Sequence, residues 1–100
     1  MGREITLTQF IDQYEGGECR ILDVREAWER PFMQGEHVIK IPINQIPQFM
    51  DMIPKTEDLV VLCQHGVRSK YAIEYLESQH NFSNLINLQG GVSTYRKASE

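Results

Sequence analysis

The sequence has little of several features that would assign it to particular classes of protein. It contains only two cysteines, Cys19 and Cys63, which are too few for a disulfide framework. No apolar run approaches the ~18–20 residues that cross a bilayer, and the amino terminus, MGREITLTQF, lacks the basic and apolar regions of a signal peptide. We therefore expect a protein of the reducing cytoplasm with no membrane partner.

Basic residues are also few. Ten Lys and Arg stand against 14 Asp and Glu, for a formal net charge of −4, so we expect no nucleic-acid partner. The three histidines (His37, His65 and His80) show no metal-ligand spacing, and we expect no metal site. The 100 residues, 41% of them hydrophobic and 24% charged, are typical of one globular domain spanning residues 1–100, which we expect to be a monomer.

Short strand-like and helix-like segments alternate along the chain. EITLTQFIDQYEGG predicts a brief strand and then a helix, which begins with a capping-box pair, Thr6 and Gln9, and ends at Gly16-Gly17. Further strands are expected in CRILDV, HVIKIPI, DLVVLC and SNLINL. Further helices are expected in REAWERPF, in IPQFMDMIP starting at Pro47, in VRSKYAIEYLESQ, and after Gly90-Gly91.

The segment DLVVLC, residues 58–63, is apolar without alternation, which is typical of a central strand covered on both faces. Strands and helices that alternate around such a strand predict an α/β fold with a mostly parallel sheet. Parallel sheets bind their ligands beyond the carboxyl ends of the strands. Cys63 lies at that end of the predicted central strand, which makes it the first candidate for a functional residue.

The residues that follow Cys63 suit a thiolate. Gly66 allows a tight turn, and a helix is predicted directly after it, so backbone N–H groups of the loop and of the helix start would surround an anion. Such a setting lowers the pKa of a thiol and favours its reactive form. The residues alone leave one alternative, an inert core cysteine at a strand end.

Three motifs resemble one known family. CQHGVRS, residues 63–69, resembles the active-site loop of the rhodanese-like sulfurtransferases in their small single-domain form. ILDVREAWE, residues 21–29, is similar to the first signature of that family, and LQGGVSTY, residues 88–95, to its C-terminal signature, with Tyr95 where Trp is usual. The segment Gln34-Gly35-Glu36-His37 departs from the usual His-Ile-x-Gly. The resemblance implies a three-layer fold, with a mostly parallel sheet of about five strands flanked by helices.

The resemblance also implies a mechanism. The thiolate of Cys63 would take a sulfane sulfur from a small anionic donor such as thiosulfate, and the resulting persulfide would pass it to a thiol or protein acceptor. No metal or organic cofactor is required for that chemistry. The resemblance assigns binding of the substrate and the persulfide to Gln64, His65, Gly66, Val67, Arg68 and Ser69.

Several of these residues have a second interpretation. Arg68 could orient an anionic donor, but pairing with a carboxylate such as Asp23 or Glu29 is favoured. Ser69 could donate a hydrogen bond to sulfur or cap the helix, and both remain open. For His65 we favour an exposed loop residue over one that tunes the thiolate.

Residues outside the loop have supporting or structural roles in this interpretation. Asp23, Arg25 and Glu29 are expected to support the loop, the charges of the Asp-Val-Arg-Glu segment fixing it through ion pairs. Cys19 is expected to be structural.

Two other functions stay open. A phosphatase or arsenate reductase can use the same fold and a Cys…Arg loop, but such loops have five residues between Cys and Arg, and this one has four. A sulfur-relay or protein-binding module with little free turnover is the second alternative, since the loop has no Lys or Arg before Arg68. The sequence leaves the physiological donor, acceptor and partner open.

Overall fold

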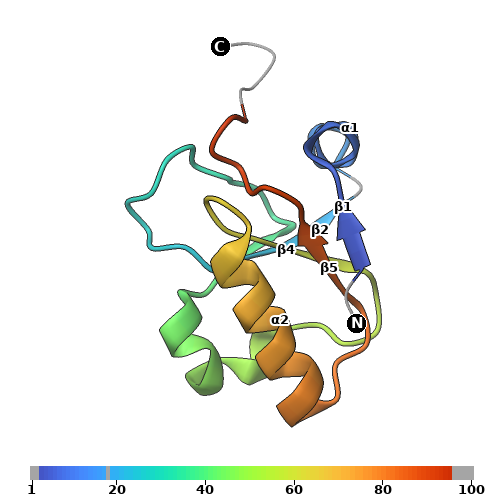
Figure 1. Ribbon diagram of the computed structural model, residues 1–100, viewed down its shortest axis with the longest axis vertical. Coiled ribbons are helices and arrows are strands. Elements are labelled where there is room, and N and C mark those ends of the chain that lie inside the picture. Colours follow the sequence, from blue (N-terminus) through green and yellow to red (C-terminus); the bar gives the residue numbers. More distant parts are fainter. Residues whose placement is uncertain (1–2, 18, 96–100) are drawn as a thin grey trace.

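Five parallel strands form one sheet in the order β1-β5-β4-β2-β3, as drawn in Figure 1 for the computed structural model. The structure describes residues 3–17 and 19–95. The strands are β1 (Arg3–Ile5), β2 (Arg20–Asp23), β3 (Val38–Lys40), β4 (Leu59–Leu62) and β5 (Leu85–Leu88). The helices are α1 (Leu7–Glu15) and α2 (Val67–His80), with two 3-10 helices, η1 (Ile43–Gln48) and η2 (Met50–Met52). The predicted α/β fold with a parallel sheet of about five strands is confirmed.

Helices cover both faces of the sheet, which gives three layers. One core cluster joins α1, through Phe10 and Tyr14, to the sheet face that presents Val60 and Leu62. The other joins α2 and η1 to the opposite face. Figure 1 shows α1 on one side of the sheet, and α2 with the 3-10 helices on the other. Among the described helices, none is long and apolar enough to cross a membrane.

The central position of β4 follows from its composition. Its four residues are at most 2% exposed, and it pairs with β2 on one side and β5 on the other. Complete burial of a Val or Leu side chain contributes roughly 1.5–3 kcal/mol to folding, so this strand carries a large share of the core energy. The carboxyl end of β4 is therefore a rigid place from which to present Cys63.

Helix α1 begins and ends as its sequence predicts. The Thr6 hydroxyl accepts from the Gln9 backbone N–H at 3.2 Å, and the Gln9 side chain accepts from the Thr6 N–H at 3.1 Å. Gly17 then takes a left-handed conformation with φ of 75°. The capping box is thus confirmed.

The segment 25–32 is a loop, so the helix predicted there is wrong. Arg25 is only 3% exposed because its side chain turns inward, where it pairs with Asp23 and donates to the Pro31 carbonyl at 2.8 Å. Its two partners lie on either side of it in the chain and close the segment into a loop. The charge of Arg25 determines the local structure here, and helix propensity does not.

The helix predicted for residues 46–54 is also different. The structure has 3-10 helices, η1 begins at Ile43, and Pro47 lies inside it. The amides of Gln45 and Phe49 donate to the carbonyls of Pro42 and Ile46, so Pro47, which lacks an N–H, is accommodated. After Gly90-Gly91 the described chain makes turns, where a short helix was predicted, and the last residues of that prediction, 96–100, lie outside the described part.

The atypical segment 34–37 forms a turn attached to α1. The Tyr14 hydroxyl donates a hydrogen bond to the Gln34 carbonyl at 3.0 Å. The oxygen of that hydroxyl also accepts one from the Gln34 N–H at 3.1 Å. The ring of Tyr14 also lies 5.4 Å from that of His37. These contacts place the turn against α1, on the opposite face of the sheet from α2.

The loop after β4 rests on the turn after β5. The amides of Val92 and Ser93 donate to the carbonyls of Cys63 and Gln64 at 3.1 and 3.0 Å. Gly91, with φ of 72°, lies so close to this loop that a Cβ would overlap the Gln64 carbonyl and come within 2.6 Å of the His65 nitrogen. The Gly-Gly pair therefore permits the close approach of two backbones.

We predict that Gly91→Ala destabilises the protein well beyond Gly90→Ala. Both glycines have positive φ, 72° and 78°, so each substitution costs roughly 1–2 kcal/mol of backbone strain. A Cβ at Gly90 meets nothing within 4 Å, whereas one at Gly91 meets the loop backbone and adds an overpacking cost of about 1–3 kcal/mol. Denaturant unfolding of both variants measures the difference. Equal losses of stability would show that the two backbones do not pack as described.

Candidate active site

The sulfur of Cys63 lies at the centre of a ring of hydrogen-bond donors. Cys63 follows β4 directly and is 1% exposed. The backbone N–H groups of Gly66 and Ser69 point at its Sγ at 3.1 and 3.3 Å. Gly66 can aim its amide inward because it adopts φ of 91°, a conformation that side-chain-bearing residues rarely take. The predicted cradle of loop amides is present.

Two opposing effects determine the pKa of the Cys63 thiol. Burial raises it, because a charged sulfur is poorly solvated inside the protein. Hydrogen bonds with the side chain and backbone N–H of Ser69, and with the backbone N–H groups of Gly66 and His65, lower it. The lowering effects prevail, so the pKa of Cys63 lies below that of an ordinary thiol, in the direction predicted from the sequence.

Ser69 is completely buried and faces the sulfur. Its Oγ lies 3.4 Å from Cys63 Sγ, while the N-cap position of α2 belongs to Gly66 and has no side-chain cap bond. The sequence left open whether Ser69 donates to the sulfur or caps the helix. In the structure the sulfur donates and the Ser69 oxygen accepts, so neither the predicted donation to sulfur nor the helix cap is present. The Ser69 hydroxyl also donates to Asn87 Oδ1 on β5. Sequence reasoning missed Asn87, whose one signal is a polar side chain within the apolar strand LINL.

Arg68 is paired with Glu29. Its guanidinium makes two 2.7 Å hydrogen bonds with the Glu29 carboxylate, which confirms the expected pairing, with Glu29 as the partner and not Asp23. The hydrogen bond from Arg68 is the main reason that the pKa of Glu29 falls to about 2. Glu29 is therefore ionised at neutral pH, and the pair ties the loop of residues 25–32 to the first turn of α2.

A second ion pair, formed by Asp23 and Arg25 at the end of β2, is joined to the Cys63 loop. Asp23 and Arg25 form an ion pair at 3.0 Å, and both side chains are at most 4% exposed. Arg25 also donates to Gln64 Oε1 at 2.9 Å, and Gln64 in turn donates to the Arg30 carbonyl at 2.8 Å. Through Gln64, these contacts join the Asp23–Arg25 pair to the Cys63 loop.

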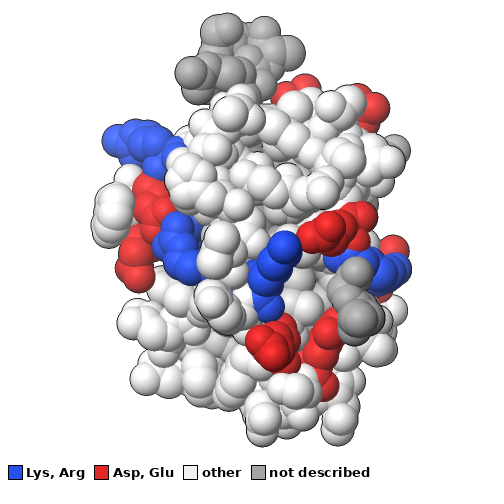
Figure 2. Space-filling model, viewed as in Figure 1, with Lys and Arg blue, Asp and Glu red and all other residues white. Residues whose placement is uncertain are grey.

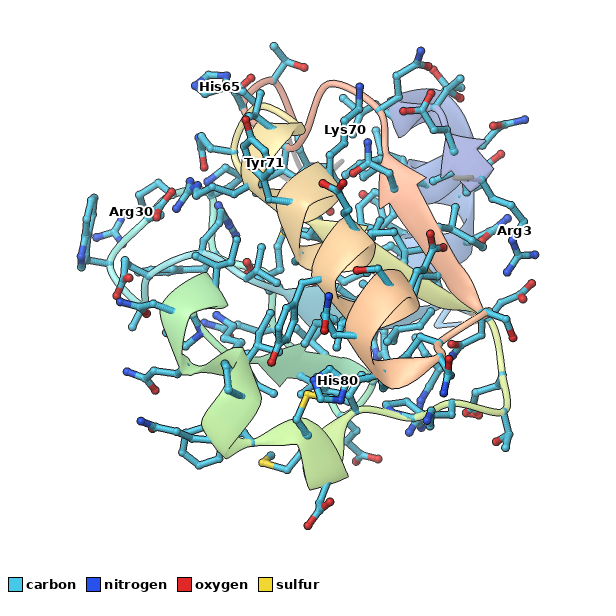
Figure 3. The ribbon with its side chains drawn as sticks, turned by 60° about the horizontal axis from the view of Figure 1, so that its bottom comes forward. Arg3, Arg30, His65, Lys70, Tyr71 and His80 are labelled. Carbon is cyan, nitrogen blue, oxygen red and sulfur yellow. The ribbon has the colours of Figure 1, made fainter. Side chains whose placement is uncertain are left out.

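The outer side of the loop is open to solvent. His65 and Val67 are exposed, as favoured for His65, and Figure 3 shows His65 at the far edge of the loop. Beside it lies a hollow of about 360 Å³ lined by Trp28, Glu29, Arg30 and Gln64. Trp28 is 73% exposed there. The hollow reaches the Cys63 loop through Gln64.

The other cysteine is in a different environment. Cys19 is 4% exposed in the core cluster next to α1, and burial raises its pKa to about 11. Both cysteines are free thiols. Cys19 is thus held as a neutral thiol, in agreement with the structural role expected for it. In the described part of the chain, no three His, Cys, Asp or Glu side chains come together as a possible metal site.

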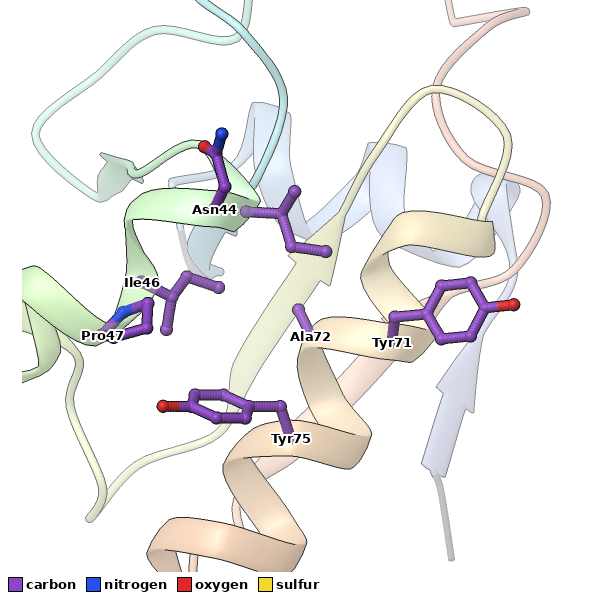
Figure 4. Close-up of a pocket in the computed structure, with 7 residues that line it drawn as sticks. Asn44, Ile46, Pro47, Tyr71, Ala72 and Tyr75 are labelled. Atoms are coloured by element: carbon purple, nitrogen blue, oxygen red, sulfur yellow. The ribbon is translucent and has the colours of Figure 1, made fainter.

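Charges on the visible surface are mixed. Figure 2 shows Lys and Arg side chains directly beside Asp and Glu, as expected from the ion pairs Arg68–Glu29 and Lys70–Glu4. A second hollow, of about 200 Å³, lies between η1 and α2 and is shown in Figure 4. It is lined by Ile43, Asn44, Ile46, Pro47, Tyr71, Ala72 and Tyr75, none of which belongs to the Cys63 loop. Of these two hollows, the first is the one that contacts the Cys63 loop, through Gln64.

Two curated relatives match most of the chain. A protein named sulfurtransferase, from Allochromatium vinosum, is 31% identical over 77 residues, which cover 77% of this chain and 71% of the relative. The thiosulfate sulfurtransferase GlpE of Shewanella oneidensis is 25% identical over 99 residues, covering 97% and 95%.

Solved structures share the fold. A rhodanese-like domain protein from Staphylococcus aureus superposes with a TM-score of 0.79 at 28% identity, covering 97% of this chain and 94% of that one. An NAD-dependent persulfide reductase from A. fulgidus superposes with a TM-score of 0.77 at 30% identity. That match covers 95% of this chain but only 16% of the reductase, so it concerns one part of a much longer protein.

A family model described as the rhodanese-like domain matches residues 6–98. The match includes the Cys63 loop, the Asp23–Arg25 segment and the Gly-Gly turn, the three places where the structure builds the site. This chain belongs to the rhodanese-like domain family.

Proposed function

We propose that this protein is a sulfurtransferase of the thiosulfate type, in which Cys63 carries the transferred sulfur as a persulfide. The observation that carries the proposal is the sulfur of Cys63 at the end of β4 with the N–H groups of Gly66 and Ser69 directed at it. The names of the two curated relatives, both sulfurtransferases, support the same reaction class.

The reaction takes place in two transfers. The Cys63 thiolate attacks the sulfane sulfur of thiosulfate, the sulfur–sulfur bond of the donor breaks, and sulfite leaves with the bonding electron pair. An acceptor thiolate, or cyanide in an assay, then attacks the outer sulfur of the persulfide. The bond between the two sulfurs breaks, and Cys63 leaves as the thiolate, ready for the next cycle.

The loop favours this chemistry through its electrostatics. The negative charge stays on sulfur throughout, first as thiolate and then as persulfide, and preorganised N–H donors stabilise it without reorganisation. A hydrogen bond to a charged group contributes about 1.5–3 kcal/mol, so two or three amides offset much of the cost of burying the anion. No metal or organic cofactor takes part in the proposed cycle.

The donor approaches, in this proposal, through the hollow beside Gln64 and Trp28. Arg30 is the one basic residue among those that line this hollow, and Arg68 is engaged by Glu29. Both thiols are free, which is the state that a reducing cytoplasm maintains and that the first transfer requires.

A second function within the same chemistry is a relay module, which receives sulfur from a dedicated partner protein and has little turnover with free thiosulfate. The observation that favours it is the engagement of Arg68, which leaves the loop itself without a free cation for a small anionic donor. A persulfide that forms rapidly from a protein persulfide donor but slowly from thiosulfate would favour this second function.

We predict that Cys63→Ser abolishes thiocyanate formation from thiosulfate and cyanide, because a hydroxyl does not form the persulfide. The matched control is Cys19→Ser, which should leave turnover nearly unchanged, because Cys19 and Cys63 belong to different core clusters. Thiocyanate production by Cys63→Ser above the uncatalysed background would contradict the mechanism.

We also predict that Cys63 is more acidic than an ordinary cysteine. On the Cys19→Ser background only Cys63 can be alkylated, and the rate of alkylation follows the thiolate fraction as pH rises. Because the pKa of Cys63 is lowered, the rate should reach its plateau at lower pH than for a cysteine in a short unstructured peptide under the same conditions. A midpoint at or above that of the peptide would mean that burial prevails over the amides.

A further inference from the structure

A buried polar chain extends from Ser69 across β5 to the protein surface. Ser69 and Asn87 are 0% and 3% exposed, so water does not replace either partner. Asn87 Nδ2 donates to Glu4 Oε2 on β1 at 3.2 Å, and the same carboxylate oxygen lies 3.9 Å from Lys70 Nζ. Figure 3 shows Lys70 on the side of α2 toward β5 and β1. The chain therefore connects the reacting sulfur to an exposed ion pair.

Glu4 determines which way the amide of Asn87 faces. An ionised carboxylate only accepts hydrogen bonds, so the Asn87 NH2 group must point to Glu4. The amide oxygen then points the other way, to Ser69, and it too only accepts. The hydroxyl of Ser69 consequently donates its proton to Asn87.

A serine hydroxyl has one proton to donate. The thiolate form of Cys63 needs a hydrogen bond from that proton, whereas the thiol form does not. As a thiol, Cys63 donates its S–H to the Ser69 oxygen, 3.4 Å away, and the chain from sulfur to Glu4 is complete. As a thiolate, Cys63 requires a donor, and Ser69 can serve only by turning its O–H away from Asn87. The buried amide oxygen of Asn87 then loses its partner.

We propose that Asn87 is a positioning residue whose amide oxygen, held toward Ser69 by Glu4, competes with the Cys63 sulfur for the single hydroxyl proton of Ser69. The backbone amides of Gly66 and Ser69 favour the thiolate, and the Ser69 hydroxyl adds to them when it turns to the sulfur; Asn87 limits that addition because it accepts the same proton. Cys63 thereby stays a thiol until a sulfur donor, or a negative charge on the sulfur, causes the Ser69 hydroxyl to rotate from Asn87 to the sulfur. That this competition serves sulfur transfer rests on the function proposed above. The competition for the Ser69 proton does not rest on it.

The test measures the ionisation of Cys63 in a double-mutant cycle on the Cys19→Ser background. Asn87→Leu removes the competing acceptor and keeps the same branched skeleton of heavy atoms, so the Ser69 hydroxyl is free to donate to the thiolate. The alkylation midpoint should fall by about one pH unit, a tenfold rise in the ratio of thiolate to thiol. In the Ser69→Ala background there is no hydroxyl to release, and Asn87→Leu should move the midpoint by less than ~0.3 unit, within the error of additivity for uncoupled sites.

The second background separates the proposal from a purely structural role. If Asn87 only packs β5 against α2, its substitution shifts the midpoint equally with and without the Ser69 hydroxyl. Three results would each overturn the proposal: equal shifts of the alkylation midpoint in the two backgrounds, no shift, or a rise of the midpoint in the protein that retains Ser69. Because alkylation does not require sulfur transfer, a failure here is distinguishable from a failure of the proposed function.

A surface variant tests the same idea while the core stays intact. A lysine in Glu4→Lys only donates, so the Asn87 amide should reverse, present its NH2 group to Ser69, and leave the Ser69 proton for the sulfur. Glu4→Lys should therefore lower the alkylation midpoint of Cys63 more when Ser69 is present than in the Ser69→Ala background. The difference between the two backgrounds removes the direct effect of the new charge, and equal falls would contradict the proposal.

The remaining charged groups around the site are the same in both backgrounds. They are Arg68 with Glu29, Asp23 with Arg25, the exposed His65 on the loop, and Lys70 beside Glu4. Their effects on the Cys63 midpoint cancel when the two backgrounds are compared, so the difference reports the proton of Ser69 alone.

Discussion

The hydrogen bonds from backbone amides to the sulfur of Cys63 are the interaction on which the rest of this structure depends. A sulfur that is 1% exposed has lost its water, and a negative charge on it is stable only where donors replace that water. Gly66 and Ser69 supply them from the loop and from the first turn of α2. The loop must therefore keep the conformation that directs these amides at the sulfur. A segment this short needs contacts with other parts of the protein to keep it.

Three supports hold that shape, and each comes from a different part of the sequence. The turn at Gly90-Gly91 follows β5, and directly after it the amides of Val92 and Ser93 donate to two loop carbonyls. Arg25, paired with Asp23, holds Gln64 from β2. Glu29 anchors Arg68 at the start of α2. The order β5-β4-β2 brings these segments to the same edge of the sheet, which explains why motifs far apart in the sequence form one site.

The sequence predicted the sheet and the centre of the site because local patterns determine them. The apolar run of β4 predicted a central strand, and Gly66 directly before an amphipathic helix predicted the cradle. The helix predicted for residues 25–32 was wrong because Arg25 turns inward to Asp23. The helix predicted for residues 46–54 formed instead as 3-10 helices, with Pro47 inside the first of them.

The role of Asn87 could not be predicted from one sequence, because its partners Ser69 and Glu4 lie 18 and 83 residues away and only the parallel pairing of β1 with β5 brings them together. The Arg68–Glu29 pair shows the opposite case. Carboxylates near the end of a neighbouring strand were candidates from the charge pattern, and the structure selected Glu29. Side-chain chemistry is thus readable from sequence, whereas the choice of partner depends on the fold.

The central claim, that Cys63 carries sulfur, is tested most directly by the intact mass of the protein after incubation with thiosulfate. The account predicts a gain equal to one sulfur atom, which disappears on addition of cyanide and is absent from Cys63→Ser. A protein that gains no mass, or that retains the gain when Cys63 is replaced, would contradict it.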